Sequence, residues 1–75
     1  MRSLFSMLKE EDEIIRNIDI AEANIELGKK HLDTYPNAEI IIKADEEKLE
    51  EAREKLAKIH KEIKNYILNI NGGEH

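Results

Sequence analysis

The sequence predicts an all-α protein, a two-helix antiparallel coiled-coil hairpin, and three observations support this fold class. Apolar residues recur every three or four positions along two long stretches, which is the heptad spacing of a coiled-coil seam. The single proline, Pro36, lies between the two stretches and disfavours helix at the residue before it. Charged residues make up 39% of the chain and aromatic residues only 4%, a composition typical of long-helix proteins.

The first stretch predicts a helix over residues 4–34. Its seam positions share one helix face and are Leu4, Met7, Glu11, Ile14, Ile18, Ala21, Ile25, Gly28, Leu32 and Tyr35. Only Glu11 among them is charged, so we expect one nearly continuous apolar face. Gly28 costs about 1 kcal/mol relative to Ala inside a helix. The hairpin register places Gly28 opposite Asp45, where it would leave room for a close or hydrated contact.

The second stretch predicts a helix over residues 38–70, after a turn at residues 35–37. Its seam positions are Ala38, Ile42, Asp45, Leu49, Ala52, Leu56, Ile59, Ile63, Tyr66 and Ile70. Asn37 is suited to cap this helix, whereas the β-branched run at residues 40–42 predicts a locally irregular start. The glycines at 72 and 73 predict the helix end, with a flexible tail over residues 71–75. The whole chain, residues 1–75, is expected to form one helical-hairpin domain.

The register of the hairpin follows from folding the chain about the turn. Small seam residues then face small ones, and large residues face large ones. The acidic start of each helix lies beside the basic end of the other, which favours antiparallel over parallel packing. On one flank Glu22 faces Arg53, whereas on the other flank Glu10 faces Glu62.

The charge and the hydropathy exclude several classes of function. The formal net charge is -5, from 12 Lys and Arg against 17 Asp and Glu. Direct nucleic-acid binding is therefore not expected, because phosphate contacts need basic residues. No segment approaches the roughly 20 apolar residues of a membrane span, so we expect no membrane association and a cytoplasmic location. The absence of Cys excludes a disulfide framework and a thiolate metal site.

The sequence predicts no catalytic, cofactor-binding or metal site. His31, His60 and His75 lie far apart in the hairpin, and none has the spacing that builds metal sites in helical bundles. A two-helix hairpin also offers no cleft to position a nucleophile and an acid–base pair, so we do not expect an enzyme. His60 lies one layer from Glu11, where a pH-sensitive contact is an alternative to a simple exposed histidine.

Apolar residues outside the seam predict the interaction surface. They form one set at the open end of the hairpin and a second stripe on helix 1. The first set is Phe5, Leu8, Ile15, Ile67 and Leu68, and the second is Ile20, Ala23 and Leu27. Clustered exposed apolar residues on a small chain indicate a partner surface. The simplest partner is a second copy, so we expect a homodimer that packs as a four-helix bundle.

Two hypotheses of function remain. The first is a non-catalytic protein-interaction module, a small acidic hairpin that acts as adaptor, regulator or inhibitor through helix-face contacts with an unidentified protein. The alternative is an acidic nucleic-acid mimic that blocks a nucleic-acid-binding protein, and a phage or mobile-element origin is compatible with it. The two hypotheses differ in their response to salt, which weakens contacts between exposed charges.

Overall fold

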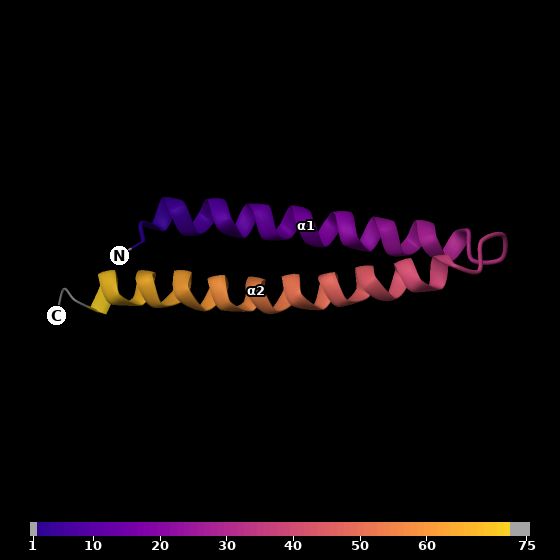
Figure 1. The fold of residues 1–75 in the computed structure, drawn as a ribbon. Helices are drawn as coiled ribbons and strands as arrows, with labels where there is room; N and C mark the ends of the chain where they lie inside the picture. Colours follow the sequence, from indigo (N-terminus) through magenta and orange to yellow (C-terminus); the bar gives the residue numbers. More distant parts are fainter. Residues whose placement is uncertain (1, 73–75) are drawn as a thin grey trace.

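Two helices, α1 (Leu4–Lys30) and α2 (Ala38–Gly72), make up the computed structural model, which describes residues 2–72. They run antiparallel and side by side, so the start of α1 and the end of α2 lie at the same end of the molecule (Figure 1). The hairpin measures 63 × 16 × 15 Å. These features confirm the predicted all-α helical hairpin.

Ser3 explains why α1 begins where the sequence predicts. Its backbone is extended, and its Oγ accepts a hydrogen bond from the backbone N–H of Ser6 at 3.1 Å. A serine cap of this kind satisfies one of the N–H groups that have no partner within the first turn. Lys29 and Lys30 occupy the last turn of α1, where positive charge interacts favourably with the helix dipole.

The end of α1 corrects the sequence prediction. The helix ends at Lys30 rather than at residue 34, and the reversal occupies residues 31–37 rather than 35–37. Within it, the backbone N–H of Thr34 donates to the carbonyl of His31 at 3.2 Å, which is a tight turn rather than α-helix. The chain has to cross the roughly 8–10 Å between packed helix axes. Antiparallel helices can be joined by only about two to five residues, so the longer reversal reflects the turn hydrogen bonds that the carbonyl of His31 accepts from Thr34 and Tyr35.

The predicted irregularity at the start of α2 is also wrong. The helix is continuous from Ala38, and Ile42 is buried against α1 while Ile40 and Ile41 face solvent. Burial of Ile42 contributes about 1.5–3 kcal/mol, which exceeds the small helix-propensity cost of β-branched residues. At its other end α2 includes residues 71 and 72, which the sequence assigned to the tail. A glycine costs only about 1 kcal/mol in a helix, so the helix extends into this segment. The remainder of the predicted tail, 73–75, lies outside the described residues.

The core is a single layer of side chains between the two helices. Its buried members are Met7, Ile14, Ile18, Ala21, Ile25, Ile42, Leu49 and Ile59. The predicted seam is confirmed over most of its length, but Leu32, Tyr35 and Ile70 are exposed. Leu32 and Tyr35 leave the seam because α1 has already ended.

Gly28 marks a close approach of the two helices. A Cβ atom added there would lie 2.7 Å from Cγ1 of Ile42 and 3.3 Å from its Cδ1. Ile42 therefore occupies the space beside Gly28, and Asp45, which the sequence predicted opposite this glycine, lines the same surface depression as Gly28.

Candidate interaction surfaces

The two long sides of the hairpin differ in chemistry. The Asn groove is formed by Asn17, Ile20, Asn24 and Leu27 of α1. Its α2 wall contains Ile41, Asp45, Lys48, Ala52 and Lys55. The opposite, acidic side is formed by Asp19, Glu22, Ala23 and Glu26 of α1. On α2 it includes Arg53 beside α1, and it continues over the outer surface of α2 with Lys43, Glu46, Glu47 and Glu50.

The α1 wall of the Asn groove has a regular pattern. Asn17, Ile20, Asn24 and Leu27 follow one another at intervals of three, four and three residues. This spacing places them on one stripe, with amide and aliphatic side chains in alternation. None of the four side chains is ionisable, and both Ile20 and Leu27 are more than half exposed. The hairpin thus presents a second heptad stripe beside the one that fills its core.

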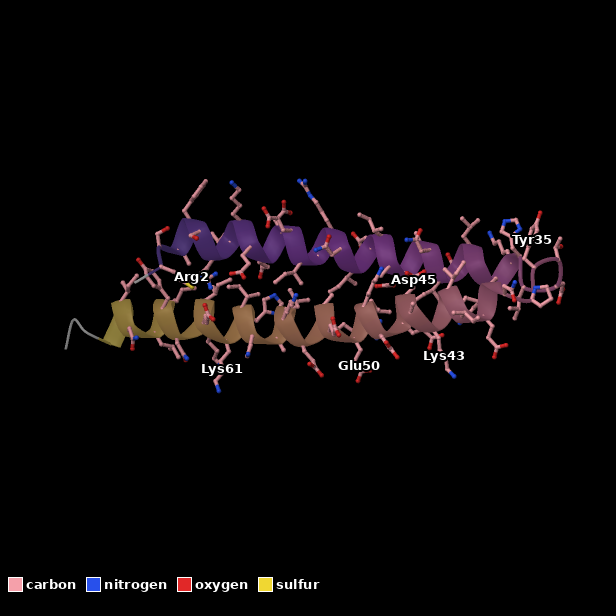
Figure 2. All side chains as sticks on the ribbon, in the orientation of Figure 1. Arg2, Tyr35, Lys43, Asp45, Glu50 and Lys61 are labelled. Atoms are coloured by element: carbon pink, nitrogen blue, oxygen red, sulfur yellow. The ribbon has the colours of Figure 1, made fainter. Side chains whose placement is uncertain are left out.

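The groove widens at the turn end of the hairpin. It has a volume of about 650 Å³ there and is lined by Leu27, His31, Tyr35, Ile41 and Asp45 among others. Tyr35 lies at the turn, and the carboxylate of Asp45 lies between the two helices (Figure 2). Sequence reasoning missed Tyr35 and Ile41 as surface residues, because it assigned Tyr35 to the seam. The signal for Ile41 was present, since only one residue of an isoleucine triplet can face the partner helix.

The acidic side carries mostly carboxylates. Glu22 and Arg53, which the sequence predicted to face each other, line the same groove on this side. Towards the open end, Nε2 of His60 lies 2.7 Å from Oε2 of Glu11. The His60–Glu11 contact, which the sequence offered as an alternative to a simple exposed histidine, is therefore present. His60 is about half exposed, and exposed pairs contribute at most about 1 kcal/mol.

The open end of the Asn-groove side is closed by a cluster of charges. Arg2 lies at the open end of the hairpin (Figure 2), and its guanidinium pairs with the carboxylates of both Glu10 and Glu62, which the register predicted to face each other. Its distance to Glu62 is 3.4 Å. The cation compensates the like charges that made this flank unfavourable in the sequence.

The eight predicted interface residues are all exposed, but they do not form one surface. Ile20 and Leu27 line the Asn groove, whereas Ala23 lines the acidic side. The predicted second stripe on helix 1 is therefore divided. A step of three residues rotates the side chain by about 300°, so Ala23 lies about 60° around the helix from Ile20, away from the groove.

The predicted open-end set belongs to other faces of the hairpin. Leu8 and Ile15 precede Glu22 at intervals of seven residues, and Ile67 follows Arg53 at twice that interval. Residues seven apart share a stripe, so these three continue the acidic side towards the open end. Phe5 and Leu68 are exposed as well. Ile20 and Leu27 thus lie on the opposite side of the molecule from Leu8, Ile15 and Ile67, so one partner helix cannot contact both groups together.

No protein-family model, curated protein or solved structure matches this chain, so its function is inferred from its own residues. Within residues 2–72, no group of three or more His, Asp or Glu side chains is placed to hold a metal ion. Neither helix in this described part of the chain is long and apolar enough to cross a membrane.

Proposed function

We propose that the protein is a non-catalytic protein-interaction module that acts as an adaptor, regulator or inhibitor through its helix faces. The Asn groove is the observation that supports this proposal. It presents Ile20, Leu27 and Ile41 to solvent on a hairpin whose own core is formed by other residues. Aliphatic side chains at heptad spacing are the anchors by which helices bind other helices.

The first partner that we propose is a second copy, which would give a four-helix bundle. A hairpin alone buries one face of each helix, so its core is thin for a chain of this length. Burial of an exposed aliphatic side chain contributes about 1.5–3 kcal/mol. The summed burial free energy of a few such residues from each copy is therefore similar in magnitude to the unfolding free energy of a small domain. Other proteins that present a helix would use the same anchors.

Light scattering coupled to size-exclusion chromatography tests self-association. We expect a mass about twice the 8.7 kDa of one chain, and we expect the double variant Ile20→Lys/Leu27→Lys to be monomeric. Phe5→Lys and Leu68→Lys are matched controls, because both side chains are exposed but neither lines the groove. A wild-type protein that stays monomeric at about 200 µM, where micromolar complexes form, would contradict self-association.

The composition of the acidic side favours a second candidate, a nucleic-acid mimic. Glu22, Glu26, Glu46 and Glu50 line a long surface with few basic residues. Such a surface would bind a basic nucleic-acid-binding protein, and the affinity would fall steeply with salt. Glu22→Lys/Glu26→Lys tests this candidate: inhibition of the target by this variant at wild-type strength would eliminate mimicry.

A further inference from the structure

We propose that the Asn groove binds the Asn groove of a second copy, with the two hairpins antiparallel about a two-fold axis that passes between Asp45 and Lys48. This inference rests on the proposed self-association and specifies its surface and register. Three features support it. The charges on α2 next to the axis are complementary, the centre of the α1 stripe lies at the same height along the hairpin as this axis, and the surrounding surfaces are charged.

The two charges of the α2 wall that lie next to the axis, Asp45 and Lys48, are self-complementary. Ile41, Asp45, Lys48, Ala52 and Lys55 follow heptad spacing. A two-fold axis between Asp45 and Lys48 places Asp45 of each copy opposite Lys48 of the other, so two equivalent ion pairs form. The same axis places Ile41 opposite Ala52 of the second copy, and the large, exposed isoleucine meets a small residue. Complementary size and charge at successive layers are the pattern of antiparallel helix packing.

The α1 wall has its symmetric centre at the same level. Asn24 and Asp45 both line the two adjoining parts of the groove, so they lie side by side across the hairpin. Because α1 and α2 run antiparallel, an axis that passes between Asp45 and Lys48 also passes between Asn24 and Ile20. It places Asn24 of each copy opposite Ile20 of the other, and Leu27 opposite Asn17, so both isoleucines lie next to the axis. An asparagine among aliphatic residues sets the register of helix packing, which suits a pairing with one defined axis.

The surrounding surfaces disfavour other self-pairings. Two acidic sides in contact would place carboxylates such as Glu22 and Glu46 beside like charges. Further along the Asn-groove side, Arg2, Glu10 and Glu62 already form a charged cluster, which limits the contact to the half of the hairpin that contains the turn.

The contact between the two copies then spans residues 38–55 of α2, about 27 Å at 1.5 Å per residue. An interface of that length buries roughly 1,000 Å² in total, at the lower end for specific complexes. We therefore expect a dissociation constant in the micromolar range.

Charge reversal at the axis tests the pairing. Asp45→Lys places two lysines opposite each other at both equivalent sites, and Lys48→Asp does the same with two aspartates. Each single variant should self-associate about tenfold more weakly than wild type or worse. An equimolar mixture of the two variants should form a heterodimer at wild-type affinity, because all facing charges are then opposite. Sedimentation velocity at low salt measures all three species.

Matched controls separate this effect from a general change in charge. Glu50→Lys and Lys43→Asp make the same changes on α2, where both side chains point away from α1 (Figure 2). They should leave self-association unchanged, and circular dichroism should show wild-type helicity for every variant. If both Asp45→Lys and Lys48→Asp dimerise as strongly as wild type, or if their mixture does not restore association, this pairing is overturned. The proposal that the protein self-associates would still stand. A monomeric wild-type protein overturns both.

Discussion

At the scale of single residues, the contact between Gly28 and Ile42 limits how closely the helices approach. Gly28→Ala adds a Cβ atom that would lie 2.7 Å from Cγ1 of Ile42. The alanine gains about 1 kcal/mol in helix propensity, but overpacking a filled core costs about 1–3 kcal/mol. We expect a net loss of about 1 kcal/mol in the free energy of unfolding, measured by chemical denaturation.

A double-mutant cycle separates the two effects. In an Ile42→Ala background the obstructing atoms are gone, so Gly28→Ala should stabilise the protein by about 1 kcal/mol. Gly28 is tolerated within α1 because its missing side chain makes room for a core residue. A destabilising Gly28→Ala in both backgrounds would show that packing against Ile42 is not the cause.

At the scale of the helices, the start of α1 depends on one side-chain hydrogen bond. Ser3→Ala removes the Oγ that accepts from the backbone N–H of Ser6. Loss of such a cap costs about 1 kcal/mol, so the midpoint of thermal unfolding should fall by several degrees. Ser6→Ala is the matched control, because Ser6 contributes only its backbone N–H to this bond. Equal midpoints for the two variants would mean that Ser3 does not cap the helix.

The helices also show which features the sequence could predict. Heptad spacing identified both helices and nearly all of the core, because the pattern arises from residues that are near neighbours within one helix. It did not locate the end of α1, because the turn hydrogen bonds at residues 31–35 leave no mark on the apolar spacing. It also grouped Ile20 with Ala23, although only the former lines the Asn groove. A groove is formed by two helices together, and its walls become evident only when their relative rotation is known.

At the scale of the whole molecule, stability and association should be linked. A hairpin with one layer of core residues is a marginal fold on its own. Any complex that forms only from folded chains stabilises the folded state by mass action. Self-association through the Asn groove would therefore supply apolar burial that the single chain lacks.

This linkage predicts that thermal stability depends on protein concentration. Each tenfold increase in concentration should favour a folded dimer over its unfolded chains by about 1.4 kcal/mol. The unfolding midpoint, followed by circular dichroism from about 5 to 500 µM, should then rise by a few degrees. Ile20→Lys/Leu27→Lys should unfold at one temperature throughout this range, because it cannot pair through the groove. A wild-type midpoint that is equally independent of concentration would mean that the hairpin reaches its full stability as a single chain, and the exposed aliphatic residues of the groove would then serve a different protein.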